Sequence, residues 1–131
     1  LFRSGMGLNR AVRPAMHDSL FFIDTDMLIP QSVFEHAKVA LSEGKAYFPI
    51  CWSYTDAKHT KGRWRVNGRG VCAVSRQIYH AAGRWPEIMQ WGSEDKLFYE
   101  AVAKLVPIVR NNEEGLYHQW HPQLNSYRPP T

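Results

Sequence analysis

A short, wholly apolar run that ends in two acids constrains this chain more than any other part of it. Residues 20–23 read LFFI, and Asp24 and Asp26 follow at once, with Pro30 close behind. Such a run predicts a buried strand at residues 19–23. Residues two apart in a strand point to the same side, so the two carboxylates can share a site just beyond its end. Carboxylate oxygens suit Mg²⁺ or Mn²⁺, and such a cation suits a diphosphate; the alternative is a solvated turn whose aspartate caps the next helix.

The rest of the chain alternates between strand and helix patterns. Further strands are predicted at residues 46–52, 70–74 and 106–110, and helices at residues 8–17, 30–44, 75–83 and from 93 onward. Alternation of this kind predicts one layered α/β domain over residues 1–131. Pro49 favours an edge or bulge position in its strand, and residues 123–131 are expected to form a tail with a frayed end.

Composition narrows the class of protein. The net charge of +4 and the pI of about 9.2 favour anionic ligands without demanding nucleic acid. Cys51 and Cys72 lie in apolar segments and predict buried free thiols, with a disulfide left open, and no cysteine zinc site is indicated. No apolar run approaches the roughly 20 residues of a membrane span. The sequence begins at Leu1, with neither an initiator methionine nor a signal peptide, so a fragment or a processed product is expected.

Residues 54–69 are predicted to form a flexible basic loop. The loop carries a single acid, Asp56, and five cations, which are Lys58, Lys61, Arg63, Arg65 and Arg69. It also contains Trp64, and basic residues interleaved with an aromatic suit a single-stranded nucleic acid. A loop that closes over a diphosphate needs the same residues, and a plain solvated loop explains them equally well.

Residues 91–95 form a second cluster, Trp91-Gly92-Ser93-Glu94-Asp95. Two carboxylates in the first turn of a helix are stabilised by the helix dipole and need no catalytic reason. A tryptophan that leads into a glycine turn beside them is unusual. It offers an aromatic platform for a sugar ring, with the carboxylates binding its hydroxyls.

A third cluster contains His118, Trp120 and His121, followed by Pro122. Histidines three residues apart can reach one site on a helix or a turn. A neutral imidazole completes an oxygen-rich Mn²⁺ site better than a Mg²⁺ site. The alternative is two surface histidines.

These clusters follow one another in a recognisable order. The quoted segments are Asn9-Arg10 with Ala15, residues 22–26 with Pro30, residues 70–76 with Tyr79, residues 83–85 with Glu87, residues 91–95, and residues 118–122. Over residues 5–122 their order and spacing resemble the C-terminal two-thirds of a GT-A fold nucleotide-sugar glycosyltransferase. The resemblance is to inverting family-two enzymes and to the galactosyltransferase-type C-terminal domain. Residues 91–95 match its Trp-Gly-x-Glu-Asp motif, whereas Arg84 stands where the second glycine of its acceptor-side turn belongs.

The resemblance implies a partial GT-A-like (Rossmann-like) fold, a mixed sheet flanked by helices. It implies a metal-dependent, inverting transfer of a sugar from a nucleoside-diphosphate sugar to a hydroxyl of a glycan-type acceptor. The expected donor is a UDP-sugar. The family's N-terminal nucleotide-binding strands have no counterpart, so a missing segment or a second chain is expected to complete the nucleotide site.

The resemblance also assigns roles to individual residues. The metal ligands for Mn²⁺ or Mg²⁺ would be Asp26, supported by Asp24, and His118, with His121 in reserve. Asp95 would be the general base, and Glu94 would hold hydroxyls. The substrate-binding residues would be Trp91, Gly92, Arg76, Trp64 and Trp120.

Two other functions compete with catalysis. The first is a glycosyltransferase-like domain that binds a nucleotide or sugar without turnover. The second, less favoured, is single-stranded nucleic-acid binding through residues 58–69, which leaves the clusters at 91–95 and 118–122 unexplained. Bacterial cytoplasm is expected as the location, in preference to the Golgi lumen.

Overall fold

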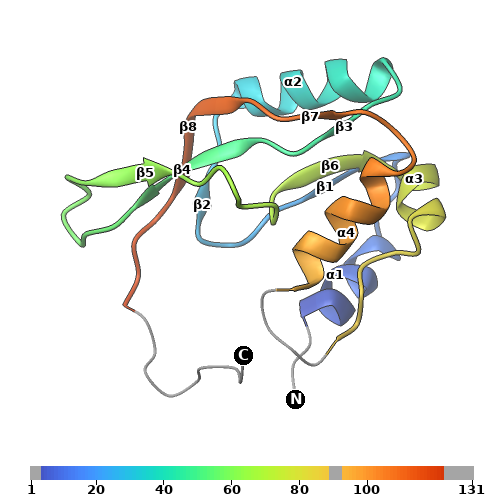
Figure 1. The fold of residues 1–131 in the computed structure, drawn as a ribbon, viewed down its shortest axis with the longest axis horizontal. Coiled ribbons are helices and arrows are strands. Elements are labelled where there is room, and N and C mark those ends of the chain that lie inside the picture. Colours follow the sequence, from blue (N-terminus) through green and yellow to red (C-terminus); the bar gives the residue numbers. More distant parts are fainter. Residues whose placement is uncertain (1–3, 89–92, 123–131) are drawn as a thin grey trace.

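The computed structural model describes residues 4–88 and 93–122, which form layers of helix and sheet (Figure 1). The helices are α1 (Ser4–Val12), α2 (Gln31–Ser42), α3 (Arg76–Ala81) and α4 (Glu94–Ala103). The strands are β1 (Ser19–Phe22), β2 (Met27–Leu28), β3 (Ala46–Tyr47), β4 (Ile50–Tyr54), β5 (Gly62–Trp64), β6 (Cys72–Ser75), β7 (Ile108–Val109) and β8 (Asn112–His118).

The strands form two four-stranded sheets, and the chain passes between them repeatedly. The first sheet has the order β1-β6-β3-β7 and the second the order β2-β8-β4-β5. The chain passes from the first sheet to the second between β1 and β2, between β3 and β4, and between β7 and β8. The pairs β3–β7 and β4–β8 are parallel and the others antiparallel. The predicted mixed α/β class is therefore confirmed, with two mixed sheets in place of one.

The first sheet is buried on both faces. In β1, Leu20 and Phe22 point into a core that includes Phe98 of α4. The intervening Phe21 packs on the opposite face, against a core that includes Val33 of α2. Figure 1 shows α2 on one side of this sheet, with α1, α3 and α4 on the other. The all-apolar run at residues 20–23 is thus a strand between two helical layers, as a run without polar positions predicts.

Local signals set several helix ends. Ser75 Oγ accepts the backbone N–H of Ile78 at 3.1 Å and caps α3, and Gly83 follows with a φ of 89°. Pro30 directly precedes α2 in an extended conformation instead of occupying its first turn. The prediction of a helix at residues 8–17 was wrong at both ends. That helix is α1, which stops before Pro14 because proline supplies no backbone donor to continue it.

Three strands were missed by the sequence patterns. β5 lies inside the predicted loop 54–69, which is therefore wrong for residues 62–64, and β2 and β8 were not predicted at all. Pro49 lies between β3 and β4, and the β4–β8 register shifts between Ile50 and Trp52, which confirms the expected irregularity. The shift is absorbed in β8, where Gly115 has a φ of 87°.

Every helix in residues 4–88 and 93–122 is too short or too polar to cross a membrane.

Candidate active site

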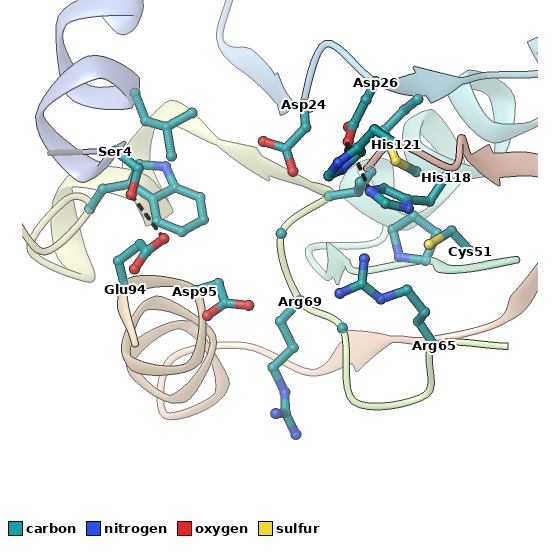
Figure 2. A pocket seen from close by; sticks show the side chains of 17 residues that line it. Ser4, Asp24, Asp26, Cys51, Arg65, Arg69, Glu94, Asp95, His118 and His121 are labelled. Atoms are coloured by element: carbon teal, nitrogen blue, oxygen red, sulfur yellow. Dashed lines mark hydrogen bonds and ion pairs between the residues drawn. The ribbon is translucent and has the colours of Figure 1, made fainter. Parts of the chain in front are cut away.

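A pocket of about 560 Å³ opens where the chain crosses between the two sheets (Figure 2). Its walls come from the β1–β2 and β3–β4 junctions, the segment between β5 and β6, the end of β8, and the first turns of α1 and α4. The lining residues are Ser4, Leu8, Asp24, Asp26, Met27, Pro49, Cys51, Arg65, Gly68, Arg69, Gly70, Val71, Trp85, Glu94, Asp95, His118 and His121.

Asp26 and the two histidines meet in one corner of this pocket. Asp26 Oδ2 lies 2.8 Å from His118 Nε2 and 3.3 Å from His121 Nε2. Backbone pairing holds them there, because Met27 is opposite His118 in the β2–β8 ladder and Gln119 N donates to Asp26 O at 3.1 Å. The two segments predicted to share a site are thus side by side, although His118 ends a strand instead of lying on a helix or turn.

The same three side chains have the geometry of a divalent-cation site. One ligand atom from each of Asp26, His118 and His121 lies within 4.8 Å of the others. Asp26 Oδ1 is buried without a hydrogen-bond partner among the described residues. Ser53 Oγ lies 3.1 Å from His118 Nδ1. In the tautomer that carries its proton on Nδ1, this N–H donates a hydrogen bond to Ser53 Oγ, and the lone pair of Nε2 is free for a metal. One carboxylate and two imidazoles fit Mn²⁺.

Asp24 faces the same pocket from the end of β1. Its pKa is raised above the usual value, first by burial of the carboxylate and then by the negative charge of Asp26, while His118 and Arg65 oppose the shift. A Cβ added at Gly70 would lie 3.6 Å from Asp24 Oδ2, which is an ordinary van der Waals contact, so the Gly70 backbone packs beside this carboxylate.

The two acids at the start of α4 lie across the pocket from Asp26, His118 and His121, which are called the metal-binding corner below because of their geometry (Figure 2). Glu94 Oε1 accepts a hydrogen bond from Ser4 Oγ at 2.9 Å. Asp95 Oδ1 accepts the backbone N–H of Lys96 at 2.8 Å. Ser93 makes no side-chain cap, so the acids themselves supply negative charge at the positive end of the helix.

Arg65 and Arg69 also line the pocket, and Figure 2 draws the guanidinium of Arg65 toward the acids and that of Arg69 away from them. Arg69 lies over the ring of Tyr99, 4.5 Å from its centroid, and its Nε is buried without a partner in the described residues. Arg110 fixes the segment that carries both arginines. Its guanidinium donates to the carbonyls of Phe48 at 3.0 Å, Val66 at 2.7 Å and Gly68.

Three predicted substrate-binding residues lie outside the pocket lining. Arg76 donates to the carbonyls of Val12, Ala15 and His17, and so fastens the segment after α1. Trp64 packs edge-on against Trp52 with ring centroids 5.3 Å apart. Trp120 is 39% exposed beyond the pocket. Trp91 and Gly92 fall outside the described residues, as does the predicted tail at 123–131.

The pocket also contains residues that the sequence patterns did not single out as site residues. Cys51 and Cys72 are both free, as predicted, yet only Cys72 is fully buried and Cys51 lines the pocket. Burial raises the pKa of the Cys51 thiol. Trp85 is 2% exposed, and its Nε1 is a buried donor without a partner among the described residues. Cys51 lies two residues before Ser53, whose hydroxyl contacts His118, so both side chains point to the same face of β4. This two-residue spacing is a signal that could have found the thiol.

Comparisons with known proteins identify a glycosyltransferase family. The family model described as chondroitin N-acetylgalactosaminyltransferase matches residues 1–126. Chondroitin sulfate N-acetylgalactosaminyltransferase 1 of Mus musculus and that of Homo sapiens are each 26% identical to this chain, in alignments of 144 positions that cover 92% of it. The chain spans 27% of the length of either relative.

The expected bacterial location is wrong. The relatives are mouse and human enzymes named for chondroitin sulfate, which points to the Golgi lumen and not to bacterial cytoplasm. The sequence reasoning rested on the lack of a membrane anchor within the chain, and that lack says nothing about the compartment.

Proposed function

Because the chain belongs to the chondroitin N-acetylgalactosaminyltransferase family of glycosyltransferases, we propose that its pocket is the transfer site of a metal-dependent glycosyltransferase. The donor is a UDP-sugar, with N-acetylgalactosamine as the sugar. The acceptor is a hydroxyl of a chondroitin-type glycan. Transfer proceeds by single displacement with inversion at the anomeric carbon, on a GT-A-like fold.

One observation carries this proposal. The Asp26–His118–His121 corner and the acids Glu94 and Asp95 face one another across a single pocket. A cation site alone serves binding as well as catalysis. A carboxylate set opposite the cation site adds what a transferase requires, which is a base on the far side of the reacting carbon.

The metal-binding corner would hold Mn²⁺ through Asp26 Oδ1 or Oδ2 and through the Nε2 atoms of His118 and His121. A bound cation supplies neutralisation of the charge that develops on the departing nucleoside diphosphate. Arg65 and Arg69 bind the same diphosphate oxygens, because guanidinium groups match phosphate geometry.

The acids across the pocket act on the acceptor. Asp95 takes the proton of the acceptor hydroxyl as that oxygen attacks the anomeric carbon and the bond to the diphosphate breaks. Glu94, held by Ser4, binds sugar hydroxyls.

Metal binding is tested by titrating Mn²⁺ into the protein in a calorimeter. Asp26→Ala and His118→Ala are expected to weaken Mn²⁺ binding at least about 100-fold, because each removes a direct ligand and outer partners alone are worth 10–100-fold. Glu35→Ala removes an exposed acid on α2 and is the control, with unchanged affinity. Unchanged affinity in Asp26→Ala would refute the metal assignment.

Catalysis is tested by Asp95→Asn, followed by release of UDP from UDP-N-acetylgalactosamine in the presence of a chondroitin oligosaccharide. Loss of the general base is expected to lower kcat about 100-fold or more with little change in donor KM. Glu100→Gln changes an exposed acid on the same helix and is the control. Near-normal turnover in Asp95→Asn excludes Asp95 as base, and a product of retained anomeric configuration by proton NMR excludes single displacement. Donor binding without transfer or hydrolysis would favour a non-catalytic domain.

A further inference from the structure

The edge strand β5 carries its positive charges on one face. Residues 61–65 read KGRWR, so cations alternate with a glycine and a tryptophan. The β4–β5 pairing continues past both ends of β5, because Thr55 N donates to Lys61 O at 3.0 Å and Arg65 N donates to Cys51 O at 2.9 Å. Successive side chains of an extended strand point to opposite faces. Lys61, Arg63 and Arg65 therefore share one face of the ladder.

That face is the one that holds the metal-binding corner. Met27 pairs with His118, His118 with Ser53, and Ser53 with Arg63, so one row crosses all four strands of the second sheet. Residues paired directly across strands lie on the same face. The contact between Ser53 Oγ and His118 Nδ1 at 3.1 Å confirms the shared side for its two members. Arg63 is thus the outer end of a row whose inner members, Met27 and His118, line the pocket.

The three cations form a continuous track that starts in the pocket. Arg65 lines it, and Arg63 and Lys61 follow outward along the β4–β5 hairpin, which projects from the body of the domain (Figure 1). At two residues per step the charges are about 6.7 Å apart and span about 13 Å. All three side chains are exposed, and none forms an ion pair with a carboxylate in the described part of the chain.

The hairpin that presents this track is held in one conformation. Asp56 accepts hydrogen bonds from Thr60 N and Lys61 N, both at 2.9 Å, and from the Thr60 hydroxyl. Tyr54 and His59 stack with ring centroids 4.2 Å apart and planes 3° from parallel. A surface fixed before binding loses less conformational entropy when a ligand arrives.

We propose that Lys61 and Arg63 bind the acceptor glycan as an anionic chain leaving the pocket past Arg65, by pairing with its carboxylate groups. This inference rests on the proposed function, since it assigns the path of the acceptor at the same site. Protection of a sheet edge also uses charged residues. Edge protection does not require that the charges share the pocket face or that the series end inside the pocket.

An acidic polysaccharide fits the track better than a single-stranded nucleic acid. Nucleic-acid binding of that kind combines a basic groove with aromatic rings on which bases stack. The aromatic of this strand, Trp64, points to the opposite face and packs against Trp52. β5 therefore offers the ligand charge without a stacking platform, which suits a chain of carboxylate-bearing sugars.

The experiment is direct calorimetric binding of an unsulfated chondroitin hexasaccharide to the protein without donor, at low and at moderate salt. The double variant Lys61→Gln/Arg63→Gln is expected to bind about tenfold more weakly, as two exposed ion pairs predict, and to show a smaller salt dependence. The matched control Lys38→Gln/Lys104→Gln removes two exposed lysines elsewhere and should leave binding unchanged. Mn²⁺ affinity should be equal in all three proteins.

The possible outcomes separate the track from the proposed function. Equal hexasaccharide binding by the double variant and the control, or no binding by the unaltered protein, overturns the track whether or not transfer occurs. Tighter binding of oligothymidylate than of hexasaccharide, lost in the double variant, also overturns it and makes the surface a nucleic-acid site. Track-dependent hexasaccharide binding without sugar transfer leaves the track standing and counts against the proposed function.

Discussion

The two ends of β8 each hold a carboxylate beside a histidine, and the two clusters differ in what the protein leaves open. Near the start, Glu113 is 4% exposed and accepts hydrogen bonds from the Tyr47 hydroxyl and from His36 Nδ1, which lies 2.9 Å from Oε1. At the far end, Asp26 contacts His118 and His121 through Oδ2 alone, and its Oδ1 is buried without a described partner.

One cluster is closed by its own hydrogen bonds, and the other borders the pocket. Both oxygens of Glu113 lie within 3.0 Å of a described donor, and Glu113 is not among the residues that line the pocket. Removing the buried donor, the Tyr47 hydroxyl, leaves a buried charge underpaired, which is costly. Asp26 lines the pocket and keeps one buried oxygen without a described partner. The same pair of residue types is thus closed by hydrogen bonds at one end of the strand and left with an unpartnered oxygen at the other.

The largest expected effect is on stability at the Glu113 cluster. Glu113→Ala leaves the buried Tyr47 hydroxyl without an acceptor and should lower the free energy of unfolding by about 3 kcal/mol. Urea denaturation followed by tryptophan fluorescence measures it. Glu114→Ala, an exposed neighbour, is the control and should change little. A loss below about 1 kcal/mol would show that the Glu113 cluster does not stabilise the fold, and the distinction between the two clusters would fail.

The metal-binding corner should show a similar effect only when cation is present. Mn²⁺ at one hundred times its Kd should raise the free energy of unfolding by about 2.7 kcal/mol, because it binds the folded state alone. Asp26→Ala should remove this gain while changing stability little without metal. The comparison is made by thermal unfolding with Mn²⁺ and with EDTA. An equal response to Mn²⁺ in both proteins breaks the distinction.

Alkaline pH should weaken the Glu113 cluster through Tyr47. Burial, and then the hydrogen bond to Glu113, raises the pKa of its phenol well above the ordinary value of 10.0. A folded-state pKa above the unfolded one stabilises the fold below pH 10 and loses that contribution as pH rises further, by about 1.4 kcal/mol at pH 11. Thermal unfolding between pH 8 and 11 should therefore fall less steeply in Tyr47→Phe. An unaltered slope contradicts the assignment.

The smallest effect is expected at the exposed member of the Glu113 cluster. The side chain of His36 is 53% exposed, so solvent replaces much of what it gives Glu113. His36→Gln should cost about 0.5 kcal/mol in unfolding free energy and leave Mn²⁺ affinity unchanged. Denaturant titration and calorimetry together check both. A cost as large as that of Glu113→Ala would show that the histidine and not the tyrosine holds the carboxylate.

The sequence predicts those elements whose signals are local. The apolar run of β1, the serine cap of α3 and the helical spacing of α2 each depend on neighbours in the chain, and all three are present. The same holds for the spacing of His118 and His121, whose three-residue separation is enough to bring both to Asp26.

Elements that depend on distant partners were missed for a physical reason. β8 begins with three polar residues, and it is a strand because β2 and β4 pair with it on either side. Glu113 could not be predicted as buried, since acids are rarely inside unless paired, and its partner Tyr47 is 66 residues away. β5 did carry a readable signal, because the alternation of cation with Gly62 and Trp64 has the two-residue period of a strand.

The hydrogen bonds from Arg110 fix the backbone of the loop between β5 and β6 without involving the side chains of that loop. Arg110 grips the loop between β5 and β6 by the carbonyls of Val66 and Gly68, and a carbonyl is present whatever amino acid occupies the position. Side chains in this loop are therefore free to change over evolutionary time while the loop keeps its place against β3 and β4. Substitutions at Arg65 and Arg69 are therefore expected to change the wall of the pocket while Arg110 keeps the backbone of the loop in place.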